Sequence, residues 1–194
     1  KRQVQKTLFI DFAIHGFEDD YARDGQRLTA IANHLIAHFA SHPKELGNYR
    51  LVIVPCANPD GAIAGKNAQR SGKNAFGRCT AAHIDINRDF GPFKGKETRA
   101  LRDFILRSKP NVYINAHGWL NETLGTKKLC QIVNRTLHLN KMKDGVYAAN
   151  EGYAIGWVHK KLNIPCCLLE YKAPNALHTK DNVRMIREII KAYR

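Results

Sequence analysis

Strand-like and helix-like segments alternate along this chain of 194 residues. Short apolar runs predict buried strands at residues 7–14, 50–56, 112–116 and 164–171. Helices are predicted at residues 21–40, where apolar side chains recur at spacings of three and four, and at residues 97–108, 150–162 and 178–193. Strands separated by helices form mostly parallel sheets. The sequence therefore predicts a three-layer α/β/α fold with a mostly parallel, mixed central sheet.

Two stretches lack this alternation. Residues 58–95 are rich in Gly, Asn, Lys and Arg and predict one long loop, and loops of that length in a compact domain are usually functional. Residues 120–145 give no clear pattern. The length suits one domain covering residues 1–194, with no repeat or linker. The chain opens without a Met or a signal peptide, so we expect either a mature fragment or a trimmed sequence, from which targeting information is missing.

The charge of the chain bears on its partners. The net charge is +14, from 31 basic and 17 acidic residues. The basic residues are spread along the sequence, and no nucleic-acid-binding motif stands out, so we expect no nucleic-acid partner. No apolar run approaches the roughly 20 residues that span a bilayer. We expect attraction to an acidic substrate or an anionic cell wall, and a secreted or cell-envelope location.

The five cysteines form no CxxC pair, so a cysteine-based zinc site is not expected. Cys56, Cys166 and Cys167 lie in apolar runs and are expected to pack as small hydrophobic side chains. One disulfide, for instance Cys79 to Cys130, is left open by the sequence.

Three possible metal ligands follow two of the predicted strands. His15 and Glu18 come directly after the first strand, and His117 comes directly after the strand at residues 112–116. In an open α/β sheet the ligand site lies beyond the carboxyl ends of the strands. Two His and one carboxylate around zinc leave one position open, as a catalytic site needs. These residues therefore predict a site for one zinc ion.

A second histidine cluster competes for this role. His34 and His38 are four residues apart, and His42 lies one turn further on. The spacing is that of an HExxH motif, but residue 35 is Leu, so the Glu of that motif is absent. We interpret these three histidines as exposed or half-buried helix residues.

Three further charged residues are candidates for catalysis. The guanidinium groups of Arg78 and Arg88 suit the binding of a carboxylate or the stabilisation of an oxyanion, although both are equally compatible with a basic surface. Glu170 ends an apolar strand, where it is either paired structurally or functional. Near a metal it could accept a proton from water and pass it to a leaving amine.

The order of these motifs resembles that of the carboxypeptidase A-like metallocarboxypeptidases, over residues 7–171. The resemblance rests on an ordered set of motifs: His15-x-x-Glu18, Asn58-Pro59-Asp60-Gly61, Asn87-Arg88, His117 and the late Glu170. By itself, Asn58-Pro59-Asp60-Gly61 predicts only a turn. The ordered set is far more specific than any one of its members.

The resemblance implies roles for these residues. His15, Glu18 and His117 would bind zinc, and Glu170 would be the general base and later the general acid. Arg78 would polarise the scissile carbonyl and stabilise the oxyanion. Arg78 is preferred to Arg70, the fallback, because its spacing to Arg88 looks like that of the shorter bacterial and cytosolic members.

The remaining implied roles concern substrate binding. Asn87 and Arg88 would hold the terminal carboxylate of the substrate. Ile155, in Ile155-Gly156-Trp157, would line the specificity pocket and brings no charge to it. Tyr147 is the candidate for the family's mobile Tyr, with Tyr153 as the alternative. Asp89 follows Arg88 where many relatives have Asn or an aromatic residue, a departure that the sequence leaves unexplained.

The short interval between Glu18 and His117 is similar to that of murein-peptide peptidases and γ-D-glutamyl-diaminopimelate peptidases. It is also similar to that of the aspartoacylase and succinylglutamate desuccinylase relatives. We expect a monomeric zinc carboxypeptidase that hydrolyses an amide bond next to a free carboxylate in a peptide or a murein peptide. The alternatives are an N-acyl-amino-acid amidohydrolase and a non-catalytic binding module of the same fold.

Overall fold

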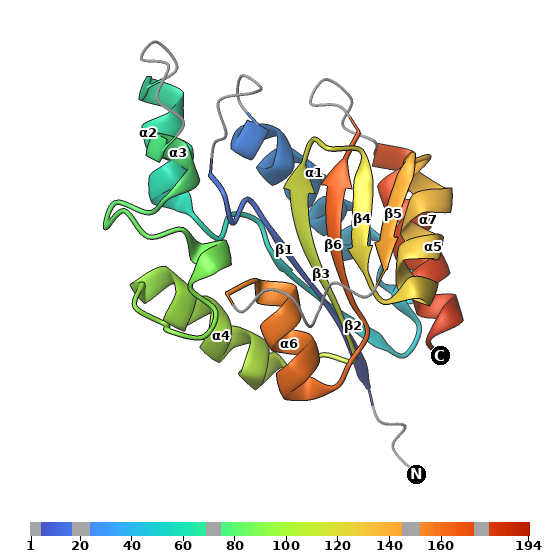
Figure 1. The fold of residues 1–194 in the computed structure, drawn as a ribbon. Coiled ribbons are helices and arrows are strands. Elements are labelled where there is room, and N and C mark those ends of the chain that lie inside the picture. Colours follow the sequence, from blue (N-terminus) through green and yellow to red (C-terminus); the bar gives the residue numbers. More distant parts are fainter. Residues whose placement is uncertain (1–4, 17–23, 69–74, 145–151, 173–178) are drawn as a thin grey trace.

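The computed structural model describes residues 5–16, 24–68, 75–144, 152–172 and 179–194. Within these ranges the chain forms one six-stranded sheet (Figure 1). The strands are β1 (Lys6–Phe12), β2 (Tyr49–Val54), β3 (Val112–Gly118), β4 (Glu122–Gly125), β5 (Lys141–Asp144) and β6 (Cys166–Tyr171).

The sheet is mixed and mostly parallel, as the sequence predicts. Its strand order is β2-β1-β3-β6-β4-β5. The pairs β1–β2, β1–β3, β3–β6 and β4–β5 are parallel, whereas β4 runs antiparallel to β6. The carboxyl ends of β1, β3 and β6 therefore meet at one edge of the sheet, where His15, His117 and Glu170 are found.

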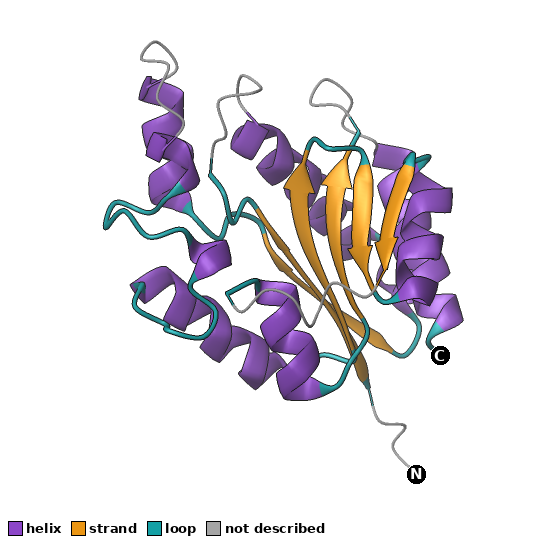
Figure 2. Cartoon of the chain, viewed as in Figure 1, coloured by secondary structure: helices purple, strands orange, loops and turns teal. Residues whose placement is uncertain are grey.

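Helices cover both faces of the sheet (Figure 2). One face carries α1 (Asp24–Ser41), α5 (Lys127–Leu137) and α7 (Thr179–Ala192), and the other carries α4 (Lys96–Ser108) and α6 (Ala154–Leu162). The remaining helical segments are α2 (Pro59–Ala68), α3 (Ala75–Arg78), and the short 3₁₀ turns η1 (Pro43–Leu46) and η2 (Ile86–Arg88). The arrangement confirms the predicted three-layer fold.

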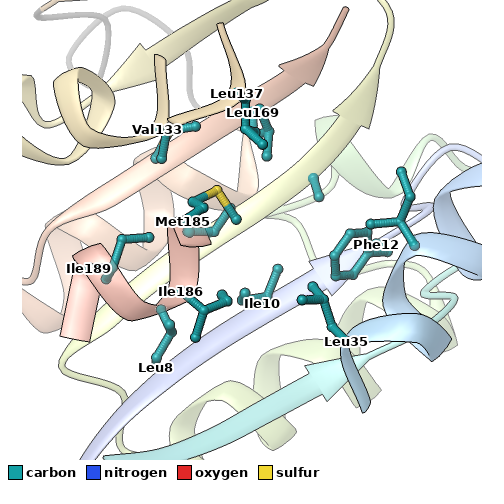
Figure 3. Close-up of a cluster of buried hydrophobic side chains, with 14 of the residues drawn as sticks. Leu8, Ile10, Phe12, Leu35, Val133, Leu137, Leu169, Met185, Ile186 and Ile189 are labelled. Atoms are coloured by element: carbon teal, nitrogen blue, oxygen red, sulfur yellow. The ribbon is translucent and has the colours of Figure 1, made fainter. Parts of the chain in front are cut away.

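Alternation along the strands creates a separate core on each face of the sheet. In β1, Leu8, Ile10 and Phe12 point toward α1 and α7, whereas Phe9 packs on the other side with Tyr113. Figure 3 shows the first of these cores, where the side chains of β1 meet those of the covering helices. The second core is smaller, and the polar side chains of the candidate site lie on the same face of the sheet.

The predicted long loop at residues 58–95 is wrong, because this stretch contains α2, α3 and η2. Asn58 caps α2: its side-chain oxygen accepts a hydrogen bond from Gly61 N at 2.9 Å. Pro59 occupies the first helical position, where its missing N–H costs nothing. In this context the Asn-Pro-Asp-Gly sequence begins a helix, although in isolation it is typical of a turn.

Two other features of the sequence find their place in the fold. Residues 120–145, which give no clear pattern, contain β4, α5 and β5. The carboxylate of Asp89 accepts hydrogen bonds from the backbone N–H groups of Lys94 (3.0 Å) and Gly95 (2.8 Å), so it orders the turn before α4. That contact accounts for an acid directly after Arg88.

The cysteines pack as small apolar side chains, with Cys166 and Cys167 buried and Cys56 half-buried. Cys79 and Cys130 do not form the disulfide that the sequence left open. The Cys130 thiol lies instead 3.8 Å from that of Cys167, between α5 and β6. No helix in the described part of the chain combines the length and apolarity that crossing a membrane needs.

The burial of β1 predicts the effect of shortening its side chains. We expect Ile10→Ala to lower the free energy of unfolding by roughly 2–5 kcal/mol, because Ile10 is fully buried and its loss leaves a cavity. Ile63→Ala is the matched control, since Ile63 is 63% exposed on α2 and should change stability little. Urea unfolding followed by circular dichroism measures both, and equal losses for the two variants would contradict the assignment of the core.

Candidate metal and catalytic site

Two imidazoles meet at the carboxyl ends of neighbouring strands. His15 lies three residues after the end of β1 and His117 lies near the end of β3, and both are almost fully buried. Their ring centroids are 5.1 Å apart, with an angle of 70° between the ring planes. With Zn–N distances of about 2.0–2.1 Å, two imidazoles on one tetrahedral ion have centroids about 5 Å apart. The separation therefore fits two ligands of a single zinc ion.

Each imidazole is oriented by a hydrogen bond at its Nε2 atom. Nε2 of His15 lies 2.9 Å from Oδ1 of Asp85, and Nε2 of His117 lies 2.6 Å from Oδ1 of Asn115. Carboxylate and amide oxygens only accept, so both Nε2 atoms donate. A metal would consequently be held through Nδ1 of each ring. Metal-binding histidines generally have such a partner on the other nitrogen.

The third predicted ligand, Glu18, lies outside the described residues. Gly16, between His15 and Glu18, is described, and its backbone packs directly on the start of α2. A Cβ at Gly16 would lie 2.1 Å from Ala62 N, so only glycine fits at this approach. Within the described ranges no three His, Cys, Asp or Glu side chains converge on one point. The two imidazoles and their partners suit zinc, and the third ligand stays a prediction.

Glu170 lies beside the histidine pair. The Cα of Glu170, on β6, is the register partner of that of His117 on β3. Directly opposite residues on neighbouring strands point to the same face of a sheet. The Glu170 side chain is nearly buried, with 9% exposure. The strand order thus brings the predicted base next to a predicted metal ligand.

A second carboxylate, which sequence reasoning missed, lies on the other side of Glu170. Glu122 on β4 is the antiparallel register partner of Glu170 and is also buried. Its Oε1 accepts a hydrogen bond from Lys143 Nζ at 2.7 Å. Lys143 supplies the counter-charge for the buried Glu122, which lies beside Glu170 and His117 across the sheet.

Arg78 reaches the histidine pair through Asp85. Its Nε donates to Oδ2 of Asp85 at 2.9 Å, while Oδ1 of the same carboxylate contacts His15. Burial alone would raise the pKa of Asp85, but the hydrogen bonds and charges of His15 and Arg78 outweigh burial and hold that pKa well below its usual range. Asp85 is therefore an ionised link between the two. Arg70, the fallback for Arg78, lies outside the described residues.

Asn58 joins the segments that carry these groups. Its side-chain Nδ2 donates to the carbonyl of Arg78 at 3.2 Å, and its backbone N–H donates to the carbonyl of Ala13 at 3.0 Å. The side chain is completely buried. One residue therefore connects the end of β1, the start of α2 and the segment that positions Arg78.

Of the two residues predicted to bind the terminal carboxylate, Asn87 is buried and Arg88 is exposed. Asn87 is buried, and its Oδ1 accepts a hydrogen bond from Ala154 N at 3.0 Å, at the start of α6. The amide oxygen is thus engaged by the backbone, and the NH₂ group is the donor that a ligand could use. The Arg88 guanidinium lies 4.1 Å from the centroid of the Tyr153 ring, and its Nη1 donates to the Asn87 carbonyl at 2.9 Å. Arg88 itself is exposed and oriented by these contacts.

The roles predicted for Ile155, in the specificity pocket, and for Tyr147, as the mobile Tyr, stay predictions. Ile155 is buried at the start of α6 and packs in the second core. Tyr147 lies outside the described residues. Tyr153, the alternative for the mobile Tyr, is described and lies under Arg88.

The competing histidine cluster is confirmed as part of a helix surface. His38 contacts Glu45 at 2.9 Å, and its ring stacks on that of His42 at 4.6 Å between centroids. His34 and His42 are exposed and His38 is half-buried. The contacts of His38 with Glu45 and His42 account for these histidines as surface residues of α1 and of the turn that follows it.

Comparison with known proteins identifies the class of this fold and site. A family model described as zinc carboxypeptidase (Peptidase_M14) matches residues 1–124. The match contains His15, Arg78 and His117, whereas Glu170 lies beyond it. The chain belongs to the zinc carboxypeptidase family.

Individual relatives agree with this assignment. Bacteriocin BCN5 of Clostridium perfringens is 32% identical over 209 residues, which cover 96% of this chain and 22% of that protein. A metallo-carboxypeptidase from Burkholderia cenocepacia superposes with a TM-score of 0.70 at 15% identity, covering 98% of this chain and 57% of that one. The murein-tripeptide amidase MpaA from Escherichia coli O157 superposes with a TM-score of 0.63 at 16% identity, covering 97% of this chain and 82% of that one.

The coverage is uneven. The chain spans about a fifth of the length of the bacteriocin and just over half of the Burkholderia enzyme. The family assignment therefore applies to the domain, and the activity of the protein is a separate question.

The contact between Asp85 and His15 predicts a change in metal affinity. We expect Asp85→Asn to weaken zinc binding by about 10- to 100-fold, the usual cost of losing the partner of a ligand histidine. Chelator competition with a zinc-sensitive dye measures the affinity. Asp103→Asn is the matched control, because Asp103 pairs with Arg102 on the surface of α4. Equal affinities for the wild-type protein and the Asp85 variant would show that this carboxylate does not support the metal.

Proposed function

We propose that this chain is a zinc-dependent hydrolase of the carboxypeptidase type, which cleaves an amide bond next to a free terminal carboxylate. The observation that carries the proposal is the meeting of three groups at one sheet edge. The His15 and His117 rings have the separation expected for one zinc ion, and Glu170 is the register partner of His117. We assign Glu18 as the third ligand of the ion.

The residues around this centre divide the chemistry between them. A zinc ion held by His15, Glu18 and His117 would supply a Lewis acid that polarises the scissile carbonyl and makes water more acidic. Glu170 would accept the proton of the attacking water and deliver it to the leaving amine. Arg78 would stabilise the oxyanion. Because its Nε donates to Asp85, the terminal NH₂ groups are the ones that would reach the carbonyl oxygen.

Arg88 would bind the terminal carboxylate of the substrate. Its guanidinium is exposed, yet its orientation is set by the Tyr153 ring and the Asn87 carbonyl. An oriented guanidinium can donate two parallel hydrogen bonds to a carboxylate. The NH₂ of Asn87 would add a third donor on the same side.

A murein peptide is the substrate that we favour over a protein C-terminus. MpaA, a murein-tripeptide amidase by name, shares the fold over 97% of this chain. The relative named as a bacteriocin also suits a role at a bacterial surface. The net charge of +14 would draw the protein to an anionic cell wall. A secreted or cell-envelope location belongs to the same proposal.

The first test removes the proposed base. We expect Glu170→Gln to bind zinc like the wild type and to lose about 10²- to 10⁴-fold in kcat, because an amide cannot accept the proton. Hydrolysis of blocked dipeptides and purified muropeptides is followed by mass spectrometry, and bound zinc by elemental analysis.

Glu188→Gln is the matched control, since Glu188 pairs with Arg135 on the helical face away from Glu170. Wild-type turnover by the Glu170 variant would refute its role as the base. Turnover of acetyl-aspartate or succinyl-glutamate by the wild-type protein, with none of the peptides cleaved, would favour the amidohydrolase alternative.

The second test concerns recognition of the free carboxylate. We expect Arg88→Gln to raise KM about 10- to 100-fold for a blocked dipeptide, the loss expected for a charge-assisted hydrogen bond. The same dipeptide with an amidated C-terminus should be a poor substrate for both proteins, with no further loss in the variant. Arg99→Gln is the matched control, because Arg99 is exposed and donates to the backbone carbonyls of Phe93 and Lys94 near the start of α4. An equal effect of Arg88→Gln on both substrates would contradict a carboxylate-binding role.

A further inference from the structure

Two buried polar residues, Asp11 and Asn115, continue from His117 into the centre of the sheet. Asp11 on β1 and Asn115 on β3 are register partners, and His117 follows two residues after Asn115 on the same face. Asp11 and Asn115 are completely buried, and His117 is 5% exposed. Buried polar side chains cost free energy unless they are hydrogen-bonded. Their presence here, where neighbouring positions are apolar, calls for a role other than packing.

The hydrogen bonds among these three residues have a defined direction. Nδ2 of Asn115 donates to Oδ1 of Asp11, and Oδ1 of Asn115 lies 2.6 Å from Nε2 of His117. Oδ1 of Asp11 accepts this hydrogen bond, so it selects the NH₂ end of the Asn115 amide. The carbonyl end then faces His117 and can only accept. Nε2 of His117 must therefore carry the proton, which leaves the lone pair on Nδ1.

We propose that Asp11 and Asn115 are positioning residues that hold His117 in the Nε2–H form and so direct its Nδ1 toward the metal. The proposal rests on the proposed function, in which His117 is a zinc ligand. Neither residue touches the substrate or the metal in this account. Asp11 orients the amide of Asn115, and Asn115 orients the imidazole.

The two histidines of the pair are held by different means. Asp85, which holds His15, is half-buried, carries its own counter-ion in Arg78 and has a pKa well below its usual range. Asp11 lies in the interior, where burial raises its pKa to about 7 even though the side chains of Tyr113 and Asn115 both act to lower it. The neutral amide of Asn115 thus stands between the buried carboxylate of Asp11 and the imidazole of His117. Asp11 therefore sets the orientation of His117 without forming an ion pair with it.

The experiment compares variants of these residues in two measurements. Nitrogen-15 NMR of the metal-free protein, with labelled histidine, reports which ring nitrogen of His117 carries the proton. Zinc affinity comes from chelator competition. We expect Asn115→Leu to shift His117 to a mixture of both neutral forms and to weaken zinc binding about 10- to 100-fold. The signals of His15, held by Asp85, should stay unchanged and serve as a reference in the same spectrum.

Two further variants separate this role from simple destabilisation. Asn182→Leu removes another completely buried amide, which bonds the Tyr171 hydroxyl on the opposite face of the sheet, and should lower stability without changing zinc affinity. Asp11→Asn keeps the size of the side chain but lets either end of the new amide face Asn115. This variant should fold, and it should weaken zinc binding less than Asn115→Leu does.

The outcomes are distinct. A wild-type His117 in the Nε2–H form, lost in Asn115→Leu together with zinc affinity, supports the proposal. A wild-type tautomer and affinity in both Asn115→Leu and Asp11→Asn would overturn it. The NMR measurement needs no metal, so it decides the tautomer even if the wild-type protein fails to bind zinc. That failure would count against the proposed function instead.

Discussion

The register of three parallel strands is the constraint on which the candidate site depends. Pairing of β1 with β3 sets Asp11 opposite Asn115, and pairing of β3 with β6 sets His117 opposite Glu170. A slip of one residue would turn one member of each pair to the other face of the sheet. The apolar alternation that buries Leu8 and Ile10 against the helices therefore also aligns the polar residues on the opposite face.

Segments outside the sheet are tied to this frame by buried amides. Asn58 links the end of β1 to α2 and to the backbone of Arg78, and Asn87 links η2 to the start of α6. Asp85 then joins Arg78 to His15 through the two oxygens of one carboxylate. Each of these links uses a side chain to satisfy backbone or side-chain groups that would otherwise be buried without partners. These hydrogen bonds hold the charged side chains of Arg78 and Asp85 beside His15 and join segments that are far apart in the sequence.

Much of this organisation could be predicted from the sequence, for identifiable reasons. The strand ends carrying His15 and His117 follow from apolar runs, which are local signals. The order of the motifs indicates the family, and the family model confirms it over residues 1–124. The start of α2 was missed because Asn58 and Pro59 suit both a turn and a helix cap, and the choice depends on contacts with Ala13 and Gly61.

Other parts of the site leave little trace in the sequence. An acid such as Asp11 inside an apolar strand indicates that the strand has a buried polar partner. That partner, Asn115, lies on a strand far along the chain and can be identified only from the register of the folded sheet. Glu122 lies in a stretch without clear periodicity, and its place beside Glu170 depends on β4 running antiparallel. Long-range pairing of this kind is a property of the folded sheet and not of any local pattern. The family resemblance supplied roles for His15 and Glu170 but not their supporting contacts.

The central claim is that His15, Glu18 and His117 hold one zinc ion in front of Glu170. Anomalous diffraction at the zinc edge, from crystals grown with stoichiometric zinc, tests it most directly. The account predicts a single strong peak bonded to Nδ1 of both His15 and His117. A peak at the surface histidines of α1 instead, or no ordered peak in a well-diffracting crystal, would contradict it.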